Sequence, residues 1–143
     1  MPVDRELTEN EKKKLFLKSY LRDKQAVRRI EEQLSELRLS KLSPGMSIGD
    51  GMPHGSDMRD LSDYAAKVDE LERELIQARY DRIQSFRKVQ AAIEELEDET
   101  EKDLLTYRYL KGMQWERIAV AMGYSWKHVH RIHAAALKNL KMT

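Results

Sequence analysis

The chain has 143 residues, of which 36% are charged and 7% are aromatic, and it contains no cysteine. This composition predicts one domain, or one and a half, rich in solvated helix, and it excludes disulfides and thiolate metal sites. The chain starts with charge rather than an apolar stretch, and its longest apolar run, Ile118 to Met122, is far below the ~20 residues that span a bilayer. We therefore expect a soluble, cytoplasmic protein with no signal peptide and no membrane contact.

The net charge of +1 conceals an uneven distribution along the chain. Residues 111–143 carry six Lys or Arg against Glu116 alone, a net charge of +5, which leaves −4 for residues 1–110. A basic C-terminal part favours a polyanionic partner. The alternative is a chance excess of lysine on a solvated tail.

Residues 1–39 predict an amphipathic N-terminal helix. The segment from Thr8 to Glu11 has the residue order of a capping box, which marks a helix start. The outer face carries mixed charge, as a solvated surface does, and the Lys12 to Lys14 run is a weaker candidate for phosphate contact. The apolar positions repeat at helical spacing: Phe16, Tyr20, Val27, Ile30, Leu34 and Leu37.

Residues 40–57 predict a flexible Gly/Pro linker, because four glycines and two prolines fall within thirteen residues. His54 has no neighbouring ligand there, so we interpret it as loop rather than metal site. Residues 58–96 then predict a long coiled-coil-like helix, with a break in the acidic segment from Glu94 to Glu101. Its apolar positions alternate threes and fours and then shift: Leu61, Tyr64, Val68, Leu71, Leu75 and Ala78, then Ile83, Phe86, Val89, Ile93 and Leu96.

The two N-terminal helices are expected to bury their apolar stripes. Burial stabilises by about 25 cal/mol per Å² of apolar surface, so each stripe needs a partner. Pairing within one chain gives a long helical hairpin. Pairing between two chains gives a homodimer through the N-terminal helices, and the sequence leaves both open.

Residues 97–143 predict a three-helix domain that ends in a helix-turn-helix. A first helix ends at Gly112, with Leu105 and Tyr109 as core candidates. Gly123-Tyr124-Ser125 then separates two short amphipathic helices, because glycine ends a helix in the left-handed conformation and serine caps the next one. Tyr124 is expected to fill the space under this turn. The apolar faces are Trp115, Ile118, Ala119 and Met122, and Val129, Ile132, Ala136 and Leu140.

The segment from Ile93 to Leu140 resembles the fourth conserved region of sigma-70-class bacterial sigma factors. The resemblance rests on RYLKG at 108–112, WERIA at 115–119, GYS at 123–125 and VHRIHAAALKNL at 129–140. It implies a helix-turn-helix that recognises duplex DNA at the −35 element and touches RNA polymerase. Together with the N-terminal helices, it predicts an all-α fold in which a long helical hairpin precedes the helix-turn-helix. The whole layout also resembles small phage and prophage proteins of unassigned function.

The candidate DNA-binding residues follow the predicted turn. The N-terminal part of such a helix enters the major groove, and arginine can hold guanine by two parallel hydrogen bonds, so Arg131 is the best base-reading candidate. The resemblance implies that Lys127, His130 and Arg131 touch bases or nearby phosphates. Trp126 departs from the charged residue usual there, which puts the target sequence in doubt. The full set is Ser125, Trp126, Lys127, His128, His130, Arg131 and Lys138.

Two tryptophans have different expected roles. Trp126 is expected either to stack on a sugar or thymine methyl, or to pack against the turn. For Trp115 the resemblance implies a core aromatic. We expect no cofactor.

Metal and enzyme functions are not expected. His128, His130 and His133 could share helix faces, but a structural zinc wants four ligands and nothing nearby completes them. We expect His130 to face DNA, and His128 and His133 to lie at the surface or on phosphate. There is no Gly-rich phosphate loop and no activated nucleophile. The acidic segment is expected to be solvated rather than to bind cations.

Our first hypothesis is therefore a phage- or prophage-type transcription regulator that binds double-stranded DNA and recruits or modifies RNA polymerase. Nothing upstream resembles the region of a sigma factor that opens the −10 element, so promoter melting is not expected. One alternative is a phage assembly or packaging protein, such as a small terminase-like helix-turn-helix subunit. Another is a module that binds polymerase without DNA.

Overall fold

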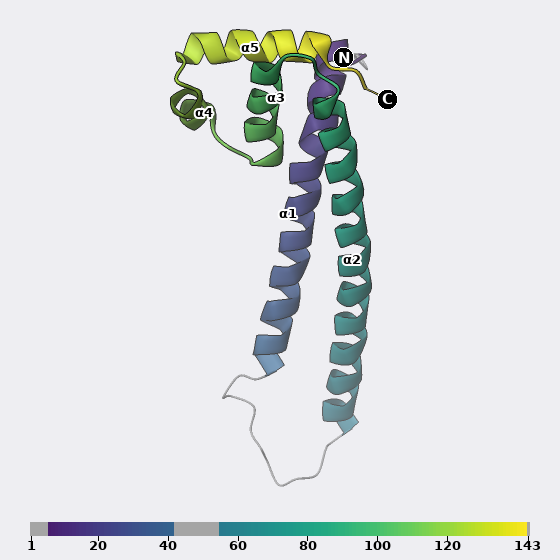
Figure 1. Ribbon diagram of the computed structural model, residues 1–143. Coiled ribbons are helices and arrows are strands. Elements are labelled where there is room, and N and C mark those ends of the chain that lie inside the picture. The colour runs from purple at the N-terminus through teal and green to yellow at the C-terminus, as the bar shows by residue number, and fades with distance from the viewer. Residues whose placement is uncertain (1–5, 42–54, 143) are drawn as a thin grey trace, which may run out of the picture. The chain divides into compact units, whose positions relative to one another are not determined.

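A computed structural model describes residues 6–41 and 55–142, and every regular element in these ranges is helical. This confirms the predicted all-α fold with a long N-terminal helix pair. Residues 42–54, which form most of the predicted linker and include His54, lie outside the described residues. The elements are α1 (Glu9–Lys41), α2 (Gly55–Glu94), α3 (Glu99–Leu105), the π-helical turn η1 (Thr106–Leu110), α4 (Trp115–Met122) and α5 (Trp126–Asn139) (Figure 1).

Helix α1 begins with the predicted capping box. The Thr8 hydroxyl accepts a hydrogen bond from the Glu11 N–H at 3.2 Å, and the Glu11 carboxylate accepts one from the Thr8 N–H at 2.9 Å. Two of the N–H groups that a helix start leaves unpaired are thus satisfied. None of the helices in the two described ranges is both long and apolar enough to cross a membrane.

The chain divides into two compact units, to which α1 and α2 both contribute residues. The hairpin unit comprises Lys24–Asp81. The helix-turn-helix unit comprises Met1–Asp23 with Arg82–Thr143. Each unit has its own apolar core.

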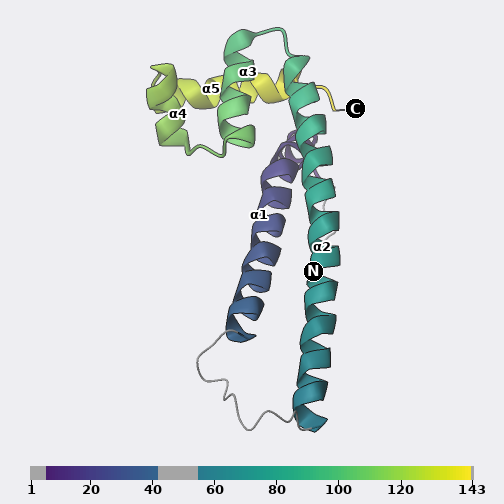
Figure 2. The same cartoon turned by 60° about the horizontal axis from the view of Figure 1, so that its bottom comes forward.

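In the hairpin unit, α1 and α2 run beside each other and bury a shared apolar cluster (Figure 2). Val27 and Leu34 of α1 are 1% and 2% exposed, and Leu71 and Leu75 of α2 are 4% and 8% exposed. The predicted pairing of the two stripes within one chain is therefore confirmed. Pairing between two chains stays a prediction.

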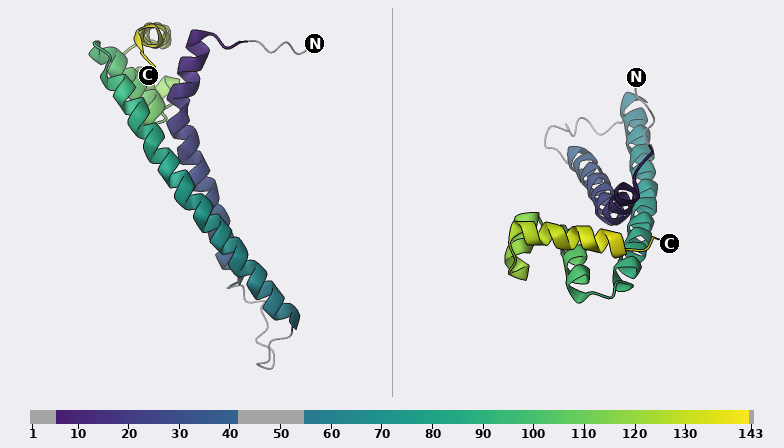
Figure 3. Two further views of the ribbon diagram at one scale, coloured as in Figure 1. Left: turned by 90° about the vertical axis from the view of Figure 1, so that its right-hand side faces the viewer. Right: turned by 90° about the horizontal axis from the view of Figure 1, so that it is seen from above.

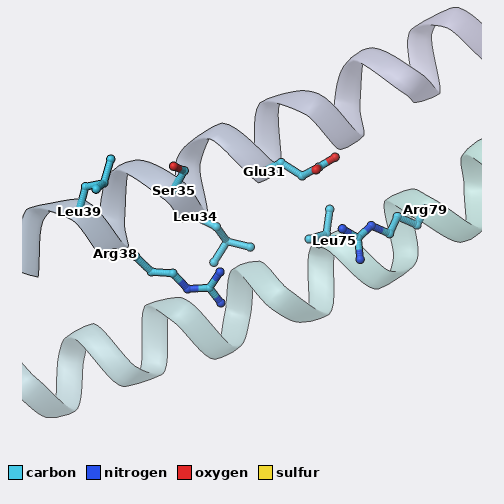
Figure 4. A pocket seen from close by; sticks show the side chains of 7 residues that line it. All are labelled: Glu31, Leu34, Ser35, Arg38, Leu39, Leu75 and Arg79. Atoms are coloured by element: carbon cyan, nitrogen blue, oxygen red, sulfur yellow. The ribbon is translucent and has the colours of Figure 1, made fainter. Parts of the chain in front are cut away.

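A groove on the hairpin unit shows how charge surrounds this apolar contact (Figure 4). Leu34 and Leu75 form its floor and approach each other from opposite helices, while Arg38 and Arg79 extend along the rim. Arg38 makes an ion pair with Glu72 on the facing helix. An exposed pair of this kind contributes little stability, so the leucines hold the helices together.

The predicted seam of α2 is wrong at two positions. Leu61 is 61% exposed. Lys41, the last residue of α1, already lies over the Tyr64 ring at 5.3 Å from its centroid, so Leu61 falls one turn beyond the reach of α1. Ile83 is 45% exposed, and Ser85 takes the buried position instead, with its hydroxyl donating to the Arg82 carbonyl at 3.1 Å.

The helix-turn-helix unit gathers residues from every helix around one core. In this unit α5 lies across α3, and α4 stands at the N-terminal end of α5 (Figures 1 and 2). Leu17 comes from α1 and is 0% exposed, so the start of α1 is part of this core. The other fully buried side chains include Val89, Ile93, Leu104, Leu105, Ile118, Val129 and Leu140.

The acidic segment separates α2 from α3, as predicted, but it is not solvated throughout. Asp98 caps α3 by accepting a hydrogen bond from the Glu101 N–H at 3.0 Å. Glu101 is only 7% exposed, and its carboxylate accepts from the Asn139 amide at 2.9 Å. A buried carboxylate needs such a partner, so this bond fastens α3 to the end of α5.

The predicted helix before Gly112 is α-helical in its first part and π-helical in its second part. After α3 the chain widens into η1, whose end is closed by a bond from the Lys111 N–H to the Thr106 carbonyl at 3.0 Å. Gly112 then adopts φ 68°, a conformation that side chains with a Cβ resist. Leu105 and Tyr109 are buried, as predicted, at 0% and 3% exposure.

Candidate nucleic-acid interface

The turn between α4 and α5 has the geometry that its sequence predicts. Gly123 ends α4 at φ 72°, and the Tyr124 N–H reaches back to the Ala119 carbonyl at 3.0 Å. Ser125 is the N-cap of α5, and its hydroxyl accepts from the His128 N–H at 3.2 Å. These bonds satisfy groups at both helix ends, so the turn fixes the start of α5.

Tyr124 does not fill the space under the turn, contrary to the prediction. Its side chain is 39% exposed and packs against the His128 ring in a T-shaped arrangement, with 4.6 Å between the ring centroids. The core under the turn already contains Ile118 and Val129, both 0% exposed. A close-packed interior leaves no volume for another large ring, so Tyr124 lies outside.

Helix α5 has one buried face and one outer face. Val129, Ala136 and Leu140 enter the core. The positions on the opposite side are exposed and follow helical spacings of four, three and four. We call them the outer face of α5: Lys127, Arg131, Ala134 and Lys138.

The outer face brings together three of the predicted DNA-binding residues, Lys127, Arg131 and Lys138. It also contains Ala134, which the sequence analysis did not include. Ala134 was not singled out, although its spacing from Lys127 and Arg131 places it on their side of the helix. Its small side chain, like that of the exposed Ala135, lets the backbone of α5 approach a partner closely. Lysine and arginine around it supply the charge that phosphates attract.

His130 lies between two indole rings rather than facing outward. Its ring centroid is 4.5 Å from that of Trp115 and 3.9 Å from that of Trp126. Its Nε2 atom is buried and has no hydrogen-bond partner among the residues that the structure describes. The expectation that His130 faces DNA directly is therefore not met by the free protein's geometry.

Trp126 packs on a neighbouring ring of α5 and stays half-exposed, so its stacking on DNA remains a prediction. One side of its indole packs on His130, and the residue is still 54% exposed next to the start of α5. Trp115 is partly buried against the core, as the resemblance implies. The exposed part of Trp126 remains free to meet a sugar or a thymine methyl.

His133 lies in the core, which corrects its expected place at the surface. It is 7% exposed, and its Nε2 lies 2.7 Å from the Tyr109 hydroxyl. Burial lowers the pKa of His133 to about 4, with the positive charges of Lys14, His130, Arg108 and Lys18 acting in the same direction. His133 is therefore neutral at physiological pH and cannot serve as a phosphate contact.

Arg108 is a structural residue that the sequence pattern did not reveal. One of its guanidinium nitrogens donates to the Met113 carbonyl at 3.0 Å, and its Cζ lies 4.6 Å from the Trp115 ring centroid. The side chain thereby ties the loop after η1 to the first residue of α4. In the sequence it showed only as part of the 108–112 motif.

His128 and Lys138 are exposed near the two ends of α5. Across residues 6–41 and 55–142, no three His, Asp or Glu side chains come close enough together to hold a metal ion. The positions around α5 instead combine cations, a half-exposed indole and small side chains. These are the groups that contact phosphates and base edges.

The short turn, the capped second helix and its cationic outer face define a DNA-binding helix-turn-helix domain. Residues 92–142 match the family model Sigma-70, region 4. This segment is therefore a sigma-70 region 4-like helix-turn-helix, as its sequence resemblance indicated. The match starts near the end of α2, so α1 and most of α2 lie outside it. Comparisons with curated proteins and with solved structures gave no match.

Proposed function

We propose that this protein is a transcription regulator of phage or prophage type that places α5 in the major groove of duplex DNA and recruits or modifies RNA polymerase. The observation that carries the proposal is the outer face of α5, where cations flank an exposed alanine opposite the buried core. We further infer that it acts in the cytoplasm and catalyses no reaction itself.

Arg131 is assigned the base-reading role. It lies in the second turn of α5, on the exposed side, where a guanidinium can reach base edges. A bidentate arginine–guanine contact contributes about 1–3 kcal/mol of discrimination against the wrong base. Lys127 and Lys138 are assigned to phosphate contacts. The lysine ammonium is a point charge on a flexible side chain, so it attracts phosphates without the directional hydrogen bonds that read a base.

The polymerase part of the proposal is supported by the family match, since the resemblance implies contact with the flap of the enzyme. The α1–α2 hairpin lies outside that match and supplies a second surface for a regulatory partner. A transcription regulator of this kind binds a DNA site and also contacts a protein. The two compact units of the chain offer one surface for each of these interactions.

Footprinting on genomic promoter fragments, with and without purified polymerase, tests the proposal. We expect a discrete protected site upstream of a transcription start, and tighter protection when polymerase is present. A large ring of subunits with no preferred promoter would favour a packaging protein. Retention by polymerase without any protected DNA would favour a module that binds only the enzyme.

A further inference from the structure

The first turns of α1 are docked on the helix-turn-helix, although they lie outside the matched segment. Leu17 is fully buried in the common core, with Phe16 and Tyr20 packed against it. The Lys13 ammonium donates to the Leu137 carbonyl at 2.8 Å. A cation at the C-terminal end of a helix satisfies unpaired carbonyls and complements the helix dipole, so Lys13 fastens α1 to the end of α5.

Lys14, Lys18 and Leu21 follow one edge of α1 at spacings of four and three. The Leu21 side chain lies close to Gly112, in the loop before α4. A Cβ added to Gly112 would be 3.5 Å from it, so this edge of α1 faces that loop. Lys14 and Lys18 therefore stand on the side of α1 that faces the helix-turn-helix. Both are exposed.

The ammonium groups of Lys14 and Lys18 are not neutralised. Neither forms an ion pair with any carboxylate of the described segments, whereas Lys12, on another side of α1, lies 3.9 Å from Glu9. Both charges act on His133 of α5, where they help to lower its pKa. Their field thus reaches the flank of α5 beside its outer face.

The two flanks of α5 are covered by different helices, with α3 on one side and the start of α1 on the other (Figure 3, right). The α3 flank carries Asn139, which is bonded to Glu101. The α1 flank carries His133 and Leu137. The exposed Ala134 of the outer face directly follows His133 of the α1 flank in the chain.

We infer that Lys14 and Lys18 bind backbone phosphates of the duplex beside the site contacted by α5, so that the start of α1 is a second, sequence-independent part of the DNA interface. The inference rests on the proposed function. Unpaired, exposed ammonium groups next to a DNA-reading helix suit phosphates, because they release condensed counterions and carry no fixed geometry for reading bases.

The test compares the full chain with Lys14→Gln/Lys18→Gln by fluorescence anisotropy on a selected duplex and on a random one, over a fourfold range of salt. Two lost phosphate contacts should lower the slope of log K against log salt by about 1.8. Raising the salt fourfold should then weaken the variant about tenfold less than the native chain. The affinity loss should be the same for both duplexes.

Lys12→Gln/Arg87→Gln is the matched control, since it removes the same charge from exposed positions of the same unit that lie off this edge of α1. It should keep the native salt slope, and thermal melting should show both double variants folded.

If the Lys14/Lys18 variant keeps the native slope and affinity while Arg131→Ala loses binding, the inference is wrong and the proposed function stands. If the variant keeps DNA binding and loses polymerase capture, this edge of α1 binds protein instead, which also overturns the inference. If the native chain binds no duplex at all, the proposed function itself fails.

Discussion

The Tyr109 hydroxyl and the His133 Nε2 atom lie 2.7 Å apart in the core of the helix-turn-helix unit and join η1 to α5. Burial raises the pKa of Tyr109 to about 12 and lowers that of His133 to about 4. Both groups are therefore neutral around pH 7, and their hydrogen bond satisfies two polar atoms that the core would otherwise leave unpaired.

This pair predicts a loss of stability in mild acid. The unfolded chain protonates His133 near the ordinary histidine pKa of 6.5, whereas burial keeps the folded chain from protonating it until about pH 4. The contribution of neutral, buried His133 to the free energy of unfolding is fully present above the pKa of the unfolded chain. It is lost as the pH falls toward the lower pKa of the folded chain. Between about pH 7 and about pH 5, His133 should lower the free energy of unfolding by about 2 kcal/mol, measured by urea denaturation.

His133→Gln separates this effect from other titrations. The variant should be less stable at neutral pH, but its stability should change less than that of the native chain over the same pH range. His128→Gln, at an exposed position, should keep the native pH dependence. Parallel curves for the native chain and His133→Gln would show that another group is responsible.

Ser125 should contribute to stability and to DNA binding by separate mechanisms. Ser125→Ala removes the acceptor for the His128 N–H and should lower the free energy of unfolding by about 1 kcal/mol. Ser125→Asp restores an N-cap acceptor and should recover that stability in thermal melts. It should nevertheless weaken DNA binding, because a carboxylate at the start of α5 repels phosphates. Equal DNA affinity for the Asp variant and the native chain would place Ser125 away from the duplex.

Gly123 tests the geometry of the turn. A Cβ at this position would meet no atom within 4 Å, so Gly123→Ala carries only the strain of φ 72°. Thermal melting should show a loss of about 1–2 kcal/mol. Gly123→Asn should lose less, since asparagine enters the left-handed region more readily than alanine does. An alanine variant as stable as the native chain would contradict this backbone conformation.

The sequence predicted the elements that depend on local chemistry. The capping box at Thr8, the left-handed Gly123 and the cap at Ser125 all form as expected, because their bonds join residues at most five apart. The family match confirmed the resemblance of the C-terminal segment to sigma-70 region 4, which its motifs had already indicated. Helical spacing also placed Val129, Ala136 and Leu140 in the core, but it missed the buried Leu137.

The errors concern residues whose place depends on distant packing. His133 and Glu101 read as solvated polar groups, but Tyr109 and Asn139, 24 and 38 positions away, supply buried partners. Ile83 matches the stripe and is still exposed. Periodicity shows that a helix has an apolar face, but not which of two adjacent lines of residues meets its neighbour.

Arg131→Ala should lower affinity mainly for the selected site, by about tenfold to one-hundredfold, and have less effect on random duplex. Lys138→Ala should weaken both duplexes slightly and to the same degree, since it removes a phosphate contact. Arg87→Ala, which removes an exposed arginine from α2, is the control and should bind as the native chain does. Equal losses on both duplexes for Arg131→Ala would remove its base-reading role.

The most direct test of DNA recognition by α5 is selection from a randomised pool of duplexes by the purified full chain in dilute buffer, followed by sequencing of the bound fraction. We expect one short motif to be enriched, the enrichment to be lost with Arg131→Ala, and binding to fall steeply as salt rises. Failure to retain any duplex even at low salt would contradict the account.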